Sequence, residues 1–221
     1  MSLKPNKKSD LGKSWNKPRR DKHIKMQLGH HLIITEGEKT EPLYFDGLKK
    51  AVERTNRTDR LQTVGTGSHT TALIEIAKRQ VRNAGYPFEH VWLVYDKDDF
   101  PSGEFNRVIE LCAEANTEET TYHAIWSNQC IELWYLLHFS YFHSDIHRDN
   151  YFPKLSDCLR KLGAGPYEKN RDDMFEILRS YIDTAILNSE KLEIDNCNKA
   201  PANCAPGTMM HVLIKFFKPY L

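Results

Sequence analysis

The sequence has few cysteines and lacks any long apolar segment. Its five cysteines are odd in number and contain no CxxC pair, which argues against a disulfide framework and against a zinc ribbon. No apolar stretch approaches the roughly 18 residues that a membrane-spanning helix needs, and the first residues are polar and charged rather than a hydrophobic signal segment. We therefore expect a cytoplasmic protein with reduced cysteines and no membrane association.

Three further motifs are incomplete. Residues 37–40 read GEKT, but a nucleotide-binding P-loop requires glycine directly before its lysine, and Glu38 stands there. The spacings of five and four between His138, His143 and His147 fit no settled zinc motif. Cys130 has no recognisable histidine partner arrangement. These absences disfavour an NTPase, a histidine zinc site and a cysteine nucleophile.

Charge is divided unevenly along the chain. Residues 1–26 hold nine Lys and Arg and two Asp, a net charge of +7, while the whole 221-residue chain has a formal net charge of +1, which leaves −6 for the remainder. This basic arm, residues 1–26, has too few apolar residues to fold alone. It is either a flexible solubilising tail or a grip on nucleic-acid phosphates. In the second interpretation the contacts are made by four residues: Lys17, Arg19, Arg20 and Lys22.

The rest of the chain alternates short apolar runs with longer segments of helical period, as in βα units. The clearest strand is HVWLVY, which is apolar on both faces, as a central parallel strand requires. We predict strands at 30–35, 61–64, 90–95 and 121–126, and helices at 41–55, 70–84, 105–115 and 130–142. Beyond Asn150 the pattern is helical to the end, with breaks at 163–166 and 201–207. The predicted fold class is α/β, organised as the arm, an α/β core (27–145) and a helical C-terminal portion packed on that core (146–221).

Two groups of acids follow predicted strands. Three glutamates come after the first strand: Glu36, Glu38 and Glu41. Three aspartates end the third: Asp96, Asp98 and Asp99. In an open α/β sheet the carboxyl ends of the strands share one edge, where ligands bind, and carboxylates crowded there suit Mg²⁺ or Mn²⁺. The alternative is that acids favour the start of the following helix by about 0.3 to 1 kcal/mol, and we assign Glu38 and Glu41 to that role.

The order of the motifs resembles the RloB-like proteins. TEGEKTEPLYFDGL, VWLVYDKDDFP, SNQCIELWYLLHF and a late YEKN occur in that order, and the similarity runs from about Arg19 to Leu221. This family is associated with bacterial restriction and abortive-infection loci and has a Toprim-like core. The resemblance implies a Toprim/Rossmann-like parallel sheet with flanking helices. It implies nucleic acid, DNA or RNA, and restriction-modification components as partners, and leaves a homodimer open.

The resemblance also implies catalytic residues. In Toprim proteins a glutamate after the first strand and a DxD after a later strand hold Mg²⁺ for phosphoryl transfer, which corresponds to Glu36, Asp96 and Asp98 here. This chain departs from many Toprim enzymes after the DxD, where it reads Asp99-Phe100-Pro101 rather than ending in glycine. The implied function is a nuclease of antiphage defence that depends on Mg²⁺ or Mn²⁺. The alternative is a non-catalytic Toprim-like module that binds nucleic acid or a partner.

Four more residues are candidates for contacting substrate or supporting the metal ligands. Lys39 is near enough in sequence to contact a phosphate, and pairing with a neighbouring carboxylate is an equal alternative. Asp99 extends the DxD. Asn128 and Glu132 belong to the SNQCIELW motif that begins just after the fourth predicted strand. There, Asn128 is also expected to cap the next helix and Glu132 to lie over its first turn.

Overall fold

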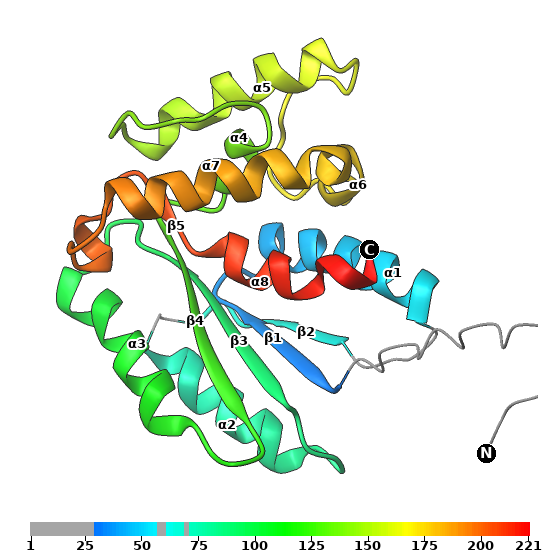
Figure 1. Ribbon diagram of the computed structural model, residues 1–221, viewed down its shortest axis with the longest axis vertical. Coiled ribbons are helices and arrows are strands. Elements are labelled where there is room, and N and C mark those ends of the chain that lie inside the picture. The colour runs from blue at the N-terminus through cyan, green and yellow to red at the C-terminus, as the bar shows by residue number, and fades with distance from the viewer. Residues whose placement is uncertain (1–28, 57–60, 69–70) are drawn as a thin grey trace, which may run out of the picture.

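The computed structural model describes residues 29–56, 61–68 and 71–221. Within these residues one five-stranded sheet has the order β2-β1-β3-β4-β5, with helices on both faces (Figure 1). Four strands are parallel to one another: β1 (His31–Thr35), β2 (Leu61–Gly65), β3 (His90–Asp96) and β4 (Thr121–Asn128). The fifth, β5 (Gly207–Thr208), is antiparallel to β4. The α/β fold class is thus confirmed, while the basic arm and its four named cations lie outside the described residues.

Two helical layers cover the sheet because successive strand residues point to opposite faces. On one face Leu32 and Ile34 pack with the helices α2 (Ala72–Asn83) and α3 (Ser102–Ala115). On the other, Ile33 belongs to a larger core with α1 (Thr40–Asn56) and α8 (Met210–Phe217). Figure 1 shows four more helices stacked beyond that second face: α4 (Glu132–Leu137), α5 (Tyr151–Lys161), α6 (Met174–Leu178) and α7 (Ile182–Asp195).

The predicted elements of the first 128 residues agree with the structure to within three residues at each end. The helix predicted at 130–142 was wrong in extent, because only α4 is helical there and residues 141–147 have no regular structure. Its later aromatic residues, including Phe139 and Phe142, pack individually against the core. They therefore imitate the spacing of a helical face without forming one.

The sequence pattern predicted a C-terminal portion that is helical throughout. The structure differs, because this portion contributes β5 to the sheet. Ser127 pairs with Thr208 and Asn128 with Gly207, and the hydroxyl oxygens of Ser127 and Thr208 lie 3.0 Å apart. The Met209 amide donates a hydrogen bond of 2.8 Å to the Trp126 carbonyl oxygen. A strand of two residues is too short to show alternation in sequence. β5 covers the end of β4 beside the acidic edge of the sheet.

Candidate active site at the carboxyl edge of the sheet

Strands β1 and β3 are neighbours, so the acids that follow them meet at one edge. The register pairs Thr35 with Val94, and the Glu36 amide continues this pairing with a 2.9 Å hydrogen bond to the Val94 carbonyl oxygen. The Glu36 carboxylate accepts a hydrogen bond of 3.2 Å from the Asp96 amide. The shared edge that the sequence predicted therefore brings Glu36 against the end of β3.

The loop after β3 has a constrained backbone. Asp98 has a φ of +37° and Gln129, in the loop after β4, has a φ of +72°, a region that few non-glycine residues adopt. The Asp98 amide donates to the Gln129 carbonyl oxygen at 3.0 Å, and the Lys97 amide donates to the Ser127 carbonyl oxygen at 2.9 Å. The two unusual residues thus stabilise each other, and the β4 loop fixes the position of Asp98.

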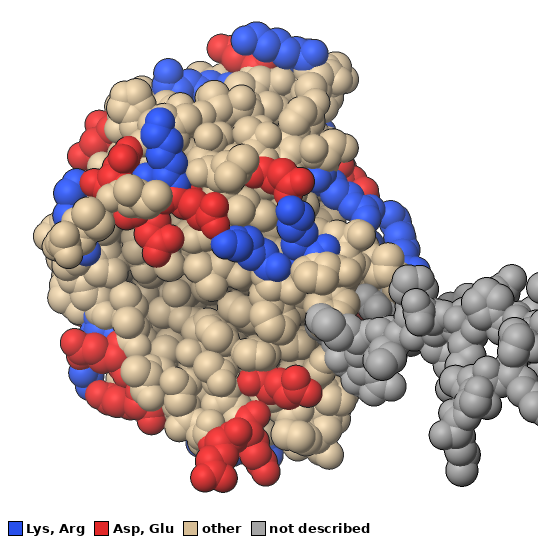
Figure 2. Space-filling view, in the orientation of Figure 1, with Lys and Arg blue, Asp and Glu red and all other residues tan. Residues whose placement is uncertain are grey.

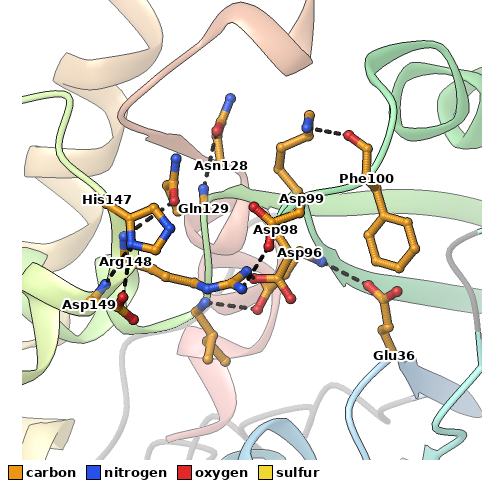
Figure 3. Close-up of polar contacts among 12 residues, drawn as sticks. Glu36, Asp96, Asp98, Asp99, Phe100, Asn128, Gln129, His147, Arg148 and Asp149 are labelled. Atoms are coloured by element: carbon orange, nitrogen blue, oxygen red, sulfur yellow. Dashed lines mark hydrogen bonds and ion pairs between the residues drawn. The ribbon is translucent and has the colours of Figure 1, made fainter.

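A pocket of about 280 Å³ lies at this edge. Four of its lining residues are acidic and two are basic: Glu41, Asp96, Asp98, Glu132, Arg148 and Lys169. Uncharged residues complete the wall: Gly37, Thr40, Cys130, Ile131 and Phe152. Glu36 is beside this lining, and Figure 3 shows it on the opposite side of Asp96 from Arg148. We call this cavity the acidic pocket.

Asp96 is the most unusual carboxylate of the acidic pocket. Its side chain is buried, one oxygen accepts a 3.1 Å hydrogen bond from the Ile131 amide, and the other, Oδ1, has no hydrogen-bond partner among the described residues. Burial, followed by the charges of Glu41 and Asp98, raises the pKa of Asp96 well above its ordinary value. A buried anionic oxygen without a donor is costly, so Oδ1 favours a proton or a cation.

From the sequence, Glu41 was assigned only to the start of a helix and not to the site. It lies in the first turn of α1, as predicted, but its carboxylate is buried in the wall of the acidic pocket. Burial, with smaller contributions from Glu132 and Glu36, raises its pKa from 4.5 to about 7. The signal was available, because the first turn of the helix after β1 must lie over the carboxyl edge of a parallel sheet.

Glu132 comes from the first turn of α4, and its position was predicted correctly. Its side chain is buried and accepts a 2.7 Å hydrogen bond from the hydroxyl of Tyr167. Tyr167 follows α5, so this contact joins the helical C-terminal portion to the wall of the acidic pocket. The buried bond fixes the orientation of the Glu132 carboxylate.

Arg148 is a site residue that the sequence did not indicate. It begins a short 3-10 helix (Arg148–Asn150), and its guanidinium forms ion pairs with Asp98 and, at 2.9 Å, with Asp99 (Figure 3). Its amide donates to the side-chain oxygen of Gln129 at 3.2 Å. Asp99 is otherwise exposed and outside the pocket lining.

Two other predicted residues lie away from the pocket lining. Lys39 is exposed. Asn128 was expected to cap α4. It is buried and does not do so, because that helix begins only at Glu132 and has no side-chain cap. Its amide nitrogen donates to the carbonyl oxygens of Pro201 and Ala202, both at 3.1 Å. Asn128 therefore anchors the loop that precedes β5.

The acidic pocket is not arranged as a finished metal centre. In the described part of the chain, no group of three or more His, Cys, Asp or Glu side chains is placed to hold one ion, and Asp98 is engaged by Arg148. The chemistry of the donors nevertheless fits a hard divalent cation, because Asp96 has an unpartnered Oδ1 and shares the pocket with three other carboxylates. Burial raises the pKa of the Cys130 thiol, so this side chain provides neither a soft ligand nor a nucleophile.

A serine, a histidine and a glutamate form a second polar chain. Ser189 Oγ lies 2.8 Å from His211 Nδ1, and His211 Nε2 lies 3.1 Å from the Glu193 carboxylate. The order is that of a hydrolytic triad, but the Ser189 side chain is fully buried and its hydroxyl donates to the Thr208 carbonyl oxygen at 3.0 Å. Because a nucleophile must reach its substrate, we assign this chain a structural role in joining α7 to β5.

The net charge of the chain outside the basic arm does not favour binding of a polyanion. Figure 2 shows acidic and basic side chains interleaved on the upper part of one face, while the middle of that face is largely uncharged. The chain outside the basic arm carries a net charge of −6. No helix in the described ranges is long and apolar enough to span a bilayer.

The sequence matches the family described as RloB-like protein over residues 31–217. This segment contains all five strands and every residue that lines the acidic pocket. No curated protein and no solved structure matches the chain. The match covers far more than half of the sequence, and the chain therefore belongs to the RloB-like protein family.

Proposed function

We propose that the acidic pocket is the active centre of a nuclease that hydrolyses phosphodiester bonds with Mg²⁺ or Mn²⁺ and acts in bacterial antiphage defence. The observation that carries the proposal is Asp96, which lines a pocket with three other carboxylates and whose buried Oδ1 lacks a hydrogen-bond partner among the described residues. Membership of the RloB-like family supports it, as does the association of that family with restriction and abortive-infection loci.

In this mechanism Asp96 and Asp98 would hold the cation, with Glu36 beside them. A bound divalent cation polarises a phosphoryl oxygen and offsets charge in the transition state. The Glu36 carboxylate, oriented by the Asp96 amide, either completes the ligand set or accepts a proton from the attacking water. The two basic residues of the lining, Arg148 and Lys169, supply charge for the substrate phosphates.

Glu41 is suited to protonate the leaving oxygen. With a pKa of about 7, both its protonated and ionised forms are populated near neutral pH, as general acid–base catalysis requires. The negative charge of Glu132 helps to retain the proton on Glu41. Tyr167 holds Glu132 in place through its hydroxyl.

The test is cleavage of a panel of single- and double-stranded DNA and RNA oligonucleotides by the purified full-length protein, with Mg²⁺, Mn²⁺ or EDTA. We expect cleavage that EDTA abolishes and that Glu36→Gln and Asp96→Asn remove. Asp157→Asn is the matched control, because Asp157 is exposed and paired with Arg160 outside the pocket. Cleavage that survives both EDTA and Asp96→Asn would disprove the proposal.

A second candidate is a non-catalytic module that binds nucleic acid or a partner. The observation that favours it is the pairing of Arg148 with Asp98 and Asp99, which leaves the DxD without a free second carboxylate. This candidate predicts binding of nucleic acid without cleavage in any of the metals. It also predicts that Asp96→Asn leaves binding unchanged.

A further inference from the structure

Arg148 lies where a bound cation would be expected. Its guanidinium reaches the DxD from a segment about 50 residues later in the chain and pairs with Asp98 and Asp99 (Figure 3). The side chain is 26% exposed, so it is packed into the pocket wall without being sealed there. The loop after β4 holds the backbone of Arg148, because the Arg148 amide donates a hydrogen bond to the Gln129 side chain.

The two aspartates of the DxD differ in the acidic pocket, because one is paired with a basic side chain and the other is not. Asp98 is neutralised by Arg148, whereas Asp96, on the same loop, has a buried oxygen with no partner in the described residues. A divalent cation that used both aspartates would have to take Asp98 from Arg148. Two cations close to one another in a partly buried pocket repel each other more strongly than in water, so Arg148 and the divalent cation would compete for Asp98.

We infer, on the basis of the proposed nuclease function, that Arg148 is an internal counterion that releases Asp98 when a divalent cation binds and then binds a phosphate of the substrate. Its planar guanidinium carries donors in a fork that matches phosphate oxygens as well as carboxylates. Asp99 is exposed and outside the pocket lining, so it can keep one end of the guanidinium while the other end turns. The ion pairs of Arg148 are thus the resting state of a substrate-binding residue.

The first experiment measures Mn²⁺ binding to the full-length protein by isothermal titration calorimetry, without nucleic acid. Arg148→Gln removes the competing charge, and we expect it to bind Mn²⁺ at least tenfold more tightly than the unmodified protein. Arg148→Lys keeps the charge but loses the fork, and should lie between the two. Arg160→Gln is the matched control, because Arg160 pairs with Asp157 outside the pocket, and it should not change the affinity.

The second experiment measures binding of a short fluorescent oligonucleotide in Ca²⁺ by anisotropy. Arg148→Gln should weaken this binding about tenfold, the opposite direction to its effect on Mn²⁺, whereas a merely structural defect would weaken both. Circular dichroism tests whether each variant is folded. If Arg148→Gln is unfolded, Arg148→Lys is compared with the unmodified protein in its place.

The outcomes separate the two proposals. Mn²⁺ affinity that is equal or lower in Arg148→Gln and Arg148→Lys would overturn the counterion role, while metal-dependent cleavage by the unmodified protein would keep the nuclease proposal. Tighter Mn²⁺ binding together with undiminished oligonucleotide binding would overturn the phosphate role of Arg148. Absence of Mn²⁺ binding in every variant, together with absence of cleavage, would overturn both the inference and the proposed function.

Discussion

The two ends of the parallel strands bury ionisable groups of opposite kinds. The carboxyl end holds the acidic pocket, whereas the amino end holds histidines packed among aromatic rings. There His90 Nδ1 lies 2.9 Å from His123 Nε2, and His31 stacks on His90 with ring centroids 5.3 Å apart. Neither ring nitrogen of the buried His31 has a hydrogen-bond partner in the described residues. The amino end is filled by rings, including Phe216, that contact these histidines.

Burial favours the neutral forms of the ionisable groups at both ends. Because these groups are histidines at one end and carboxylic acids at the other, the stability contributions of the two ends respond to pH in opposite directions. Burial, with repulsion from His90, lowers the pKa of His31 from 6.5 to about 3, so its contribution to stability is lost as pH falls below 6.5. Burial raises the pKa of Glu41 from 4.5 to about 7, so its contribution falls as pH rises through that interval. In the described part of the chain, the buried carboxylates of the carboxyl end line an open pocket, which is why this end is the candidate site.

The largest effect expected is loss of cleavage in Asp96→Asn. Removing the carboxylate should lower kcat at least about 100-fold, or roughly 2.7 kcal/mol, because the amide cannot hold the divalent cation. The same change should raise the melting temperature at pH 8, since a buried repulsive charge is lost. Initial rates and differential scanning calorimetry measure the two effects. His123→Gln, at the amino end, should leave cleavage unchanged, and an equal loss there would contradict the assignment of the site to one end.

The next effect is on stability at acidic pH. In the His31→Phe variant the unfolded chain no longer takes up this proton, so the loss of stability of about 1.4 kcal/mol per pH unit below pH 6.5 should disappear. Relative to the unmodified protein, the variant should gain about 2 kcal/mol of stability between pH 8 and pH 5. Urea unfolding between pH 5 and 8 measures this difference. His143→Phe is the control, because His143 is exposed. Parallel pH profiles of unmodified protein and His31→Phe would contradict the burial argument.

A stability effect of similar size and opposite sign is expected at the carboxyl end. Glu41→Gln should stabilise the protein at pH 8 by about 3 kcal/mol more than at pH 4.5, because the native carboxyl keeps its proton to about pH 7. Cleavage should become slower and lose its decline above pH 7, as expected if a general acid is removed. Glu38→Gln, exposed and three residues away, is the control for both measurements. A stability gain that is the same at both pH values would rule out the raised pKa as its cause.

The smallest effect concerns the basic arm, which lies outside the described residues. Deleting residues 1–26 should weaken nucleic-acid binding about tenfold near physiological salt, or roughly 1.4 kcal/mol. The slope of log affinity against log salt concentration should also flatten, by about 0.9 for each contact with a duplex phosphate that the deletion removes. Fluorescence anisotropy over a salt series measures both. Equal affinities and slopes would mean that the arm is a solvated tail.

The sequence predicted the carboxyl end of the sheet because buried parallel strands read as apolar runs and the acids follow them directly. HVWLVY and the DKDD after it locate β3 and its aspartates without any tertiary information. Arg148 and Lys169 could not be predicted in this way, because they lie in segments whose contact with the pocket depends on how α5 packs. The histidines of the amino end were present in the strand patterns, but only the pairing of His31 with His90 shows that they meet.

Strand β5 has a consequence for the timing of synthesis. Residues 207–217 leave the ribosome after every residue that lines the acidic pocket, and until then Ser127 and Asn128 lack their partners in β5. A nascent chain therefore carries all the acids of the pocket beside an open sheet edge, and the face that holds His31 has not yet received Phe216. The segment that covers the end of β4 beside the acidic pocket is therefore the last part of the sheet that can form during synthesis.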